Sequence, residues 1–480
     1  MNTLSKYKFL MKVILIQILL LLNISSFSQH FVWAKSASSF APNRLSINDM
    51  VVDSLGSIYV TGGFYGNVNL DDTFFTANGI CNGYVAKLDT GWNVEWIKTF
   101  SSGNYTNCTA IDISKTGELY IIGTFDGTLQ IDTIQLISLG STDIFFAKYD
   151  TSGIFKIAGS IGSASSDEGK GIATSNGYFA LCGKFSDTIF FPDTIISPIV
   201  IEGSCECSFV VLYDSIGNYK WSKYGANIID MNDSFIITSS QYVVYDSQMN
   251  QGQLSNVKKY DYNGTMLWKT EPTLVLYYPC YILSNDIAFD NEGNIYLCGL
   301  FVGPTIWDTI SISSAPPSTF LTKYSSTGVP QWVRKISGDP NNPNPKITIN
   351  NNFIYLNSSF SNFPAYIGND TLITMGQDDI YIVKLDKFNN LFWSKRYGGN
   401  QNEMVSSIAV TNDNIVFTAG YSYSNPVLFD DKIVSNGYFI AKLDTLHYLN
   451  IPNYFNENIS IYPNPSIGSF QVKGEGIISI

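Results

Sequence analysis

Histidine is almost absent from this chain of 480 residues. The two histidines are His30 near one end and His447 near the other, so the body between them has none. Ser-His-Asp and Cys-His catalytic sites need a histidine beside the nucleophile, and many zinc sites use histidine ligands. No glycine-rich phosphate-binding loop stands in the sequence either. We therefore predict no catalytic residue and no metal ligand of these classes.

Charge is also scarce, since only 14% of the residues are charged and the net charge is −12. The 28 Lys and Arg residues form no basic stripe, which argues against a nucleic-acid partner because phosphates need a basic footprint. Hydrophobic residues make up 45%, and the 30 Tyr and 31 Phe residues favour strands. The composition predicts an all-β protein whose surface is covered largely by Ser, Thr, Asn, Gly and Tyr.

Cysteine is sparse, and its odd count of seven argues against a disulfide framework. Cys182 and Cys298 stand inside strand-like segments, which predicts buried thiols. Cys205 and Cys207 flank a single Glu, but no second ligand pair stands nearby, so we predict no metal there. The segment "DNEGN" (290–294) resembles part of a calcium loop without its closing Glu, which favours a hairpin turn. We expect no cofactor, with calcium as the open alternative.

The one long hydrophobic run lies at the N-terminus. Lys6 and Lys8 precede the apolar stretch 9–24, and the small residues Ser26 and Ser28 come just before Gln29. This pattern predicts a secretory signal peptide over residues 1–28, and an uncleaved anchor is the alternative. No later run is long enough to span a bilayer, so we expect an exported chain with no transmembrane segment after cleavage.

A short pattern recurs along the rest of the chain. Copies of "YVAKLD" centre on Lys87, Lys148, Leu212, Lys259, Lys323, Lys384 and Lys442. They stand 58 to 64 residues apart, except for one gap of 47. An upstream pair of strands such as "MVVDSLGSIYVTGGF" (50–64) and a downstream aromatic strand such as "VEWIKTF" (94–100) complete each unit. Seven units of four short strands predict a seven-bladed β-propeller over residues 29–446, with an open solenoid as the rival.

The two ends of the repeat region complement each other. No Trp strand follows Lys442, whereas "HFVWAKS" (30–36) is a Trp strand with no unit before it. We therefore predict that the N-terminal strand completes the last unit and closes the ring, because a solenoid would leave two edges unpaired. The short gap before Lys259 predicts that this unit lacks the extra hairpin of the others. We expect the closed ring to be a monomer.

The segments "IYVTGGF", "YVAKLD" and "VEWIKTF", repeated in this order, resemble the SBBP-type family of seven-bladed β-propeller repeats. The resemblance covers residues 29–445, nearly the whole mature chain. It implies the propeller architecture. It implies no activity, because that family is defined by its repeat rather than by a shared chemistry.

The segment "ISIYPNPSIGSFQV" (459–472) is similar to the start of the type A C-terminal sorting domain that exported proteins of Bacteroidota carry. The residues that carry this resemblance are Tyr462, Pro463, Asn464, Pro465 and Gly468. It implies a small β-sandwich, of which residues 459–480 form only the beginning after a linker at 447–458. It also implies type IX secretion machinery as a partner, and a secreted location or attachment to the outer-membrane surface.

An Asp-Thr-aliphatic tripeptide recurs and is similar to the O-glycosylation motif of exported Bacteroidota proteins. The candidate threonines are Thr133, Thr188, Thr194, Thr309 and Thr371. Asp and Thr also suit turns that enter strands, and we favour that interpretation.

For function, the sequence favours a binding or adhesion protein with a glycan or protein ligand on the propeller loops. The alternative is a carbohydrate-active hydrolase or lyase that uses carboxylates in the channel. The predicted inner strands are apolar or neutral apart from Asp53 and Asp112, which argues for binding. The adjacent acidic pairs are interpreted as solvated turn residues, namely Asp167 with Glu168 and Asp378 with Asp379.

Overall fold

The computed structural model describes residues 29–37, 44–201, 204–245, 251–274, 280–336, 344–350, 353–361, 364–444, 460–462 and 471–473. The chain divides into one compact unit over Phe31–Asp444 and a second that combines Met1–His30 with Thr445–Ile480. In the described ranges, no helix is long and apolar enough to cross a bilayer.

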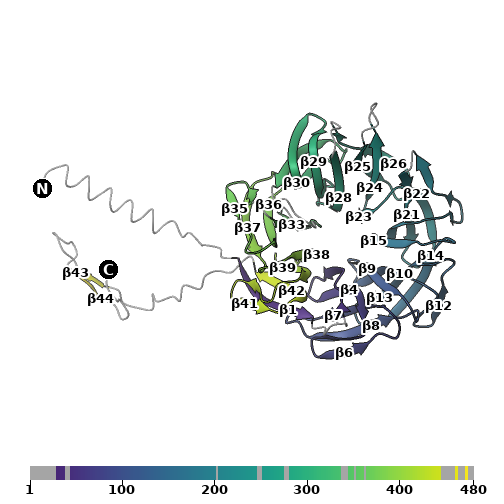
Figure 1. Cartoon of the computed structure of the whole chain (residues 1–480), viewed down its shortest axis with the longest axis horizontal. Coiled ribbons are helices and arrows are strands. Elements are labelled where there is room, and N and C mark those ends of the chain that lie inside the picture. Colours follow the sequence, from purple (N-terminus) through teal and green to yellow (C-terminus); the bar gives the residue numbers. More distant parts are fainter. Residues whose placement is uncertain are drawn as a thin grey trace. The chain divides into compact units, whose positions relative to one another are not determined.

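The Phe31–Asp444 unit is a β-propeller, in which antiparallel blades of four strands surround a central axis (Figure 1). Each blade is named by its inner strand. Three blades comprise β3 (Asp49–Val52), β4 (Ile58–Tyr65), β7 (Asn82–Leu88) and β8 (Val94–Phe100); β9 (Thr106–Ile113), β10 (Glu118–Phe125), β13 (Asp143–Asp150) and β14 (Phe155–Ile161); β15 (Glu168–Ser175), β16 (Tyr178–Lys184), β21 (Ser208–Asp214) and β22 (Tyr219–Tyr224). The short strand β2 (Arg44–Leu45) extends the β3 blade by pairing with β4.

The next two blades share one sheet, because β25 and β28 pair in parallel at Gly252–Cys280 and Gln253–Tyr281. Their strands are β23 (Ile228–Met231), β24 (Ile236–Tyr245), β25 (Gln251–Tyr260) and β26 (Met266–Thr270); β28 (Cys280–Phe289), β29 (Ile295–Trp307), β30 (Ile310–Tyr324) and β31 (Pro330–Ile336). The strand β27 (Thr273–Leu274) pairs with β29.

The remaining blades are β32 (Lys346–Asn350), β33 (Phe353–Ser361), β36 (Asp378–Asp386) and β37 (Leu391–Tyr397); β38 (Glu403–Val410), β39 (Val416–Ser422), β42 (Gly437–Asp444) and β1 (His30–Ala37). The N-terminal strand β1 therefore lies beside β42, from the other end of the unit. Phe31 of β1 is fully buried, with its ring centroid 5.4 Å from that of Tyr397 and 5.1 Å from that of Phe429.

Two contacts explain why the "YVAKLD" pattern recurs. The first is a cross-strand pair in which the lysine of the third strand lies opposite an aromatic residue of the second, as Lys87 does with Tyr59. In four blades the ammonium lies 5.1 to 5.8 Å from the tyrosine ring centroid, namely Lys87, Lys148, Lys323 and Lys384. Such cation–π contacts stabilise a blade. The repeated lysine is thus a structural residue.

The second contact is a turn in which the aspartate at the end of the pattern accepts backbone N–H groups two and four residues later. Asp89 accepts from Gly91 and Asn93, each at 2.8 Å. The same bonds form at Asp150, Asp214, Asp261 and Asp386. The aspartate therefore fixes the tight turn into the outer strand.

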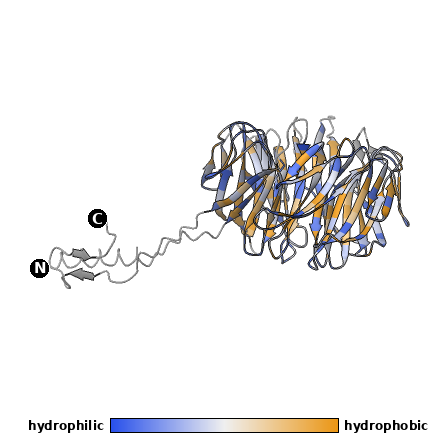
Figure 2. Ribbon diagram, turned by 90° about the horizontal axis from the view of Figure 1, so that it is seen from below, coloured by the Kyte–Doolittle hydropathy of each residue, from blue (hydrophilic) through white to orange (hydrophobic). Residues whose placement is uncertain are grey.

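Small outer hairpins decorate several blades, and Figure 2 shows the blade strands running between the two faces of the propeller. These hairpins are β5 (Asn67–Leu70) with β6 (Thr73–Thr76), β11 (Thr128–Ile131) with β12 (Ile134–Ile137), β17 (Ile189–Phe190) with β18 (Ile195–Ile196), β19 (Ile199–Ile201) with β20 (Ser204–Glu206), β34 (Ala365–Ile367) with β35 (Asp370–Leu372), and β40 (Val427–Phe429) with β41 (Lys432–Val434). The blade around Lys259 has no such hairpin among its described residues, because β24 pairs directly with β25 along its length, as predicted.

The candidate glycosylation threonines lie on these outer segments or in the long β29–β30 hairpin. Asp132 and Asp308 occupy turn tips with positive φ angles of 49° and 54°, which an aspartate tolerates better than most residues. Thr133 and Thr309 follow them and are exposed. Thr371 in β35 is exposed, and Thr188 and Thr194 are half-buried just before β17 and β18. The turn interpretation fits these positions, and glycosylation stays a prediction.

The cysteines agree with the sequence analysis at two positions and add one disulfide. Cys182 and Cys298 are buried thiols, as predicted. Cys207 is disulfide-bonded and so is not a thiolate metal ligand.

In the second unit, β43 (Ser460–Tyr462) pairs with β44 (Gln471–Lys473) in antiparallel register, with Tyr462 opposite Gln471. The other predicted sorting-motif residues lie outside the described residues, namely Pro463, Asn464, Pro465 and Gly468. The predicted signal peptide at 1–28 and linker at 447–458 also lie outside them.

Candidate functional site

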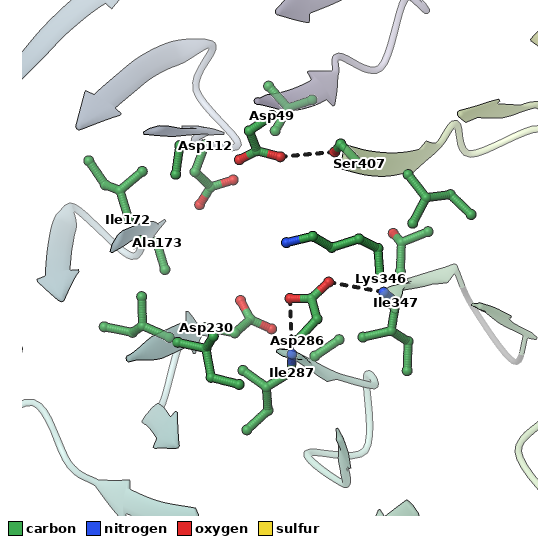
Figure 3. A pocket seen from close by; sticks show the side chains of 18 of the residues that line it. Asp49, Asp112, Ile172, Ala173, Asp230, Asp286, Ile287, Lys346, Ile347 and Ser407 are labelled. Carbon is green, nitrogen blue, oxygen red and sulfur yellow. Dashed lines mark hydrogen bonds between the residues drawn. The ribbon is translucent and has the colours of Figure 1, made fainter. Parts of the chain in front are cut away.

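The inner strands of the blades line a central cavity of about 320 Å³, called the channel (Figure 3). Its charged side chains are Asp49, Asp112, Lys170, Asp230, Asp286 and Lys346. Strand register puts these acids in two layers. In the first layer, Asp49 lies opposite Thr61 of β4, and Asp286 lies opposite Cys298 of β29. Each of these partner residues comes just before a glycine of its strand. Asp112 and Asp230 lie opposite Tyr120 and Ile237, two residues farther along the channel.

All four channel aspartates make the same pair of backbone hydrogen bonds. Oδ1 accepts the N–H of the following residue at 2.7 to 3.0 Å. Oδ2 accepts an N–H from the next blade, at Ile111, Thr174, Phe289 and Ile347, at 2.7 to 3.1 Å. Each carboxyl group therefore links two neighbouring inner strands, so its first role is to hold blades together.

Burial raises the pKa of each channel aspartate, because the interior disfavours the charged form. The pKa of Asp112 rises to about 8 and that of Asp230 to about 7. For Asp49 and Asp286 burial again raises the pKa, while the positive charge of Lys346 acts in the opposite direction. In Figure 3 Lys346 reaches toward the axis among the four carboxyl groups.

At one end of the channel the inner strands bulge. The pairing register skips Thr109, Lys170, Asn285 and Ser406, each one residue before the first channel layer. Asn48 and Asn227 precede the same layer, and their N–H groups bond to Thr61 O and Ser239 O. These six residues are called the mouth ring. A β-bulge changes the direction of the extra side chain, so these bulges bring polar groups together at the channel entrance.

Three mouth-ring atoms stand out by their hydrogen bonding. Asn227 Oδ1, Asn285 Oδ1 and Ser406 Oγ are buried and have no hydrogen-bond partner among the described residues. A buried polar atom without a partner costs about 1 to 3 kcal/mol, so native structures contain few of them. Asn285 and Ser406 line one cavity, and such atoms suit a ligand that supplies hydrogen-bond donors.

A second cavity of about 430 Å³ adjoins the mouth ring and shares Asn285 and Lys346 with the channel. It is called the cup and is lined by Ile47, Asn48, Asn285, Asn344, Lys346, Met404, Val405, Ser406, Tyr421 and Tyr438. Polar amides, a hydroxyl and two tyrosines thus meet in one concave site, the usual mixture for recognising a small polar ligand.

The prediction for the channel carboxylates was partly wrong. Asp112 does line the channel. Asp53 does not: it accepts the N–H groups of Leu55 and Ser57 and the hydroxyl of Tyr59, so it shapes the turn between β3 and β4. The sequence analysis missed the other acids, namely Asp49, Asp230 and Asp286. A period of two along an inner strand, counted from the bulge, is the signal that would have found them.

The interpretation of the adjacent acidic pairs as solvated turn residues was wrong for three members. Asp167, Asp378 and Asp379 are 1%, 2% and 0% exposed, whereas Glu168 is exposed. Two of these buried acids, Asp167 and Asp379, lie near an acidic residue from another part of the chain instead. Burial raises the pKa of Asp143 to about 6, and the nearby charge of Asp167 adds to this shift.

The Asp379 carboxyl group is similarly placed near Glu403. It accepts Met375 N–H at 2.8 Å and pairs with Arg396 at 3.0 Å. Burial, and to a smaller degree the charge of Asp379, raises the pKa of Glu403. These acids lie at blade junctions away from the channel, where their bonds to backbone and side chains are structural.

Metal binding finds no further support in the described ranges, where no group of three His, Cys, Asp or Glu residues could hold an ion. The "DNEGN" segment forms the turn between β28 and β29. Asp290 accepts the N–H groups of Glu292 and Asn294 and the hydroxyl of Tyr296 there.

No protein-family model matches the chain. An uncharacterised WD repeat-containing protein of Acanthamoeba polyphaga mimivirus is 23% identical over 454 residues, which is 83% of this chain. The chain spans 31% of that relative's length. The similarity to a WD repeat-containing protein agrees with a repeat architecture, and the low identity assigns no activity.

Two solved structures are similar at low scores. The phage phi92 endosialidase has a TM-score of 0.38 at 10% identity, over 93% of this chain and 75% of that one. A DUF4221-family member from Bacteroides vulgatus has a TM-score of 0.35 at 8% identity, over 87% of this chain and 98% of that one. Because both TM-scores are below 0.5, they carry no argument about activity.

Proposed function

We propose that this protein is an exported, non-catalytic binding protein that captures a glycan or protein ligand at the mouth ring. In this proposal the blades form a seven-bladed, SBBP-like ring closed by β1 and acting as a monomer. Residues 1–28 direct export, and the segment at 459–480, after the linker at 447–458, engages the type IX secretion machinery. The protein then resides outside the cell or on the outer-membrane surface, as an adhesion or capture module.

The observation that carries the binding proposal is the set of unpartnered buried atoms on the mouth ring. Asn227, Asn285 and Ser406 come from three different blades, so no single strand accounts for them. A ligand that donated one hydrogen bond to Asn285 and one to Ser406, which line the same cavity, would remove an unfavourable free energy of about 1 to 3 kcal/mol per atom.

The chemistry of the channel supports binding over catalysis. Both oxygens of each channel aspartate already accept backbone N–H groups, so these acids are held as structural links. One observation favours the enzyme alternative: the raised pKa values of Asp112 and Asp230 resemble what a general acid needs at neutral pH. A glycan hydrolase or lyase is therefore the second candidate function.

A glycan array with the purified full chain tests the proposal, with calcium present and with a chelator. We expect selective retention of some glycans, unchanged by the chelator, with the bound glycans intact. Asn285→Ala should lower retention, whereas Asn218→Ala should not, because Asn218 lies in an exposed turn where it bonds Asp214. Cleavage of an arrayed glycan that is lost in Asp112→Asn would establish the enzyme alternative instead.

The export part of the proposal has its own test. A reporter protein that carries residues 1–28 at its N-terminus and residues 459–480 at its C-terminus should reach the cell surface or medium in a bacterium with a type IX system. A Tyr462→Ala fusion should export less. Equal export of both fusions would contradict the assignment of the motif.

A further inference from the structure

We propose that the cup is a carbohydrate subsite and that its ligand is a neutral, hydroxyl-rich sugar ring. This inference rests on the proposed binding function and names the ligand class and the residues that recognise it.

The size of the cup suits a small saccharide. Its volume is about 430 Å³, and small-molecule sites in proteins usually enclose roughly 300 to 1,000 Å³. The cup can therefore hold one or two sugar rings, with the rest of a longer glycan outside.

The hydrogen-bonding groups of the cup come from three neighbouring blades. Asn285 of β28 donates to Asn344 Oδ1, and Asn344 donates to the carbonyl oxygen of Val405 in β38, both at the long distance of 3.4 Å. Bonds of this length are weak, so a sugar hydroxyl can replace either at little cost. Asn285 Oδ1 and Ser406 Oγ are the unpartnered acceptors in the same wall. The cup therefore offers both donors and acceptors, as the hydroxyl groups of a sugar require.

Aromatic side chains also line the cup, namely Tyr421 and Tyr438. The ring centroids of Tyr421 and Tyr438 lie 4.7 Å apart, and Tyr423 lies 4.8 Å from Tyr421. The guanidinium of Arg44 lies 5.4 Å from the Tyr421 ring centroid and helps to fix that ring. Tyr421 and Tyr438 are half-buried and Tyr423 is 45% exposed, so part of the cluster faces solvent. The apolar face of a pyranose packs well on such rings.

The charge of the cup selects a neutral ligand. No carboxylate lines the cup, and its one cation is Lys346. Lys346 also lines the channel, where it reaches toward the aspartates and its charge acts on Asp49 and Asp286 (Figure 3). Lys346 is thus shared with the channel, and Arg44 lies over the Tyr421 ring rather than in the lining, so the cup has no cation of its own for an acidic sugar. We therefore assign a neutral hexose rather than a uronic or sialic acid.

Ser406→Ala is the most informative variant, because it removes a buried hydroxyl that has no partner. If Ser406 serves only the fold, its loss should lower stability or leave all properties unchanged. If it binds sugar, its loss should leave stability equal or higher, yet weaken binding about 2- to 10-fold, the value of one hydrogen bond. Tyr421→Ala should weaken binding at least as much. Tyr366→Ala, an exposed tyrosine on the β34–β35 hairpin, is the matched control.

The experiment is calorimetric titration of the full chain with neutral oligosaccharides, and with uronic- and sialic-acid oligosaccharides of equal length. Preference for a neutral sugar, with losses in Ser406→Ala and Tyr421→Ala but not Tyr366→Ala, is the expected result. Preference for an acidic sugar overturns the inference. Sugar binding that neither cup variant weakens places the site elsewhere, which overturns the inference but leaves the proposed function standing. Binding of no glycan overturns the inference, and capture of a protein by the mouth ring would then preserve the proposed function.

Discussion

The buried carboxyl of Asp112 should make stability fall as pH rises from 5 to 7. Its pKa in the folded chain is about 8, whereas an ordinary aspartate has a pKa near 4. Between these values the folded chain holds a proton that the unfolded chain has released, so a rise in pH favours unfolding. The slope per carboxyl is at most about 1.4 kcal/mol per pH unit, or about 3 kcal/mol over two units. Asp230, with a pKa of about 7, adds to the fall.

The assay is urea unfolding of the wild-type chain and of Asp112→Asn at pH 5, 6 and 7. The amide cannot titrate, so the variant should lose about 1 to 3 kcal/mol less than the wild type over this interval. The two proteins are compared by the slope of the free energy of unfolding against pH, not by absolute stability. The amide N–H₂ of the variant faces a backbone N–H donor, and this mismatch lowers stability at every pH.

Asp214→Asn is the matched control for that assay. Burial opposes the shift at Asp214, but hydrogen bonds from Lys220 and Asn218 outweigh it and lower the pKa to about 2. This aspartate therefore titrates below the tested interval, and its variant should keep the wild-type slope. An unchanged slope in Asp112→Asn, or a wild-type stability that rises from pH 5 to 7, would refute the reasoning.

Three further predictions concern packing and modification. A Gly299→Ala substitution would put a methyl group 2.0 Å from Leu283 O, so denaturant unfolding should show a loss of more than 2 kcal/mol; a loss under 0.5 kcal/mol would contradict the packing at this position. Phe31→Ala should cost about 3 to 5 kcal/mol in the same measurement, because the buried ring packs on Tyr397 and Phe429, and an unchanged midpoint would show that β1 adds little to the fold. Peptide mass spectrometry of protein exported from a Bacteroidota host should find glycan on the exposed residues Thr133 and Thr309, and unmodified peptides at both would favour the turn interpretation alone.

The strand repeat could be predicted because its signals are local. Most units carry a lysine across from an aromatic residue and an aspartate that fixes the next turn, and both contacts lie within one blade. The short, mostly apolar runs of the second and third strands, such as β4 and β7, add a third local signal. These features repeat at nearly constant spacing, so they indicate a four-stranded unit without knowledge of how the units are arranged.

The channel and the cup could not be predicted in the same way, because they combine residues from different blades. Asp49 and Asp286 share a layer only once bulges at Asn48 and Asn285 set the register, and a bulge leaves no clear sign in one sequence. The burial of Asp379 likewise depends on Arg396, 17 residues later, and on Glu403 in the next blade. Acidity alone therefore did not distinguish turn, blade junction and channel.

The most direct test of the binding account is a crystal structure of the full chain with the glycan that binds best in the array. The account predicts an intact glycan in the cup, with hydroxyl groups within hydrogen-bond distance of Asn285 Oδ1 and Ser406 Oγ. A glycan on the outer hairpins, or a cleaved product beside Asp112 in the channel, would contradict it.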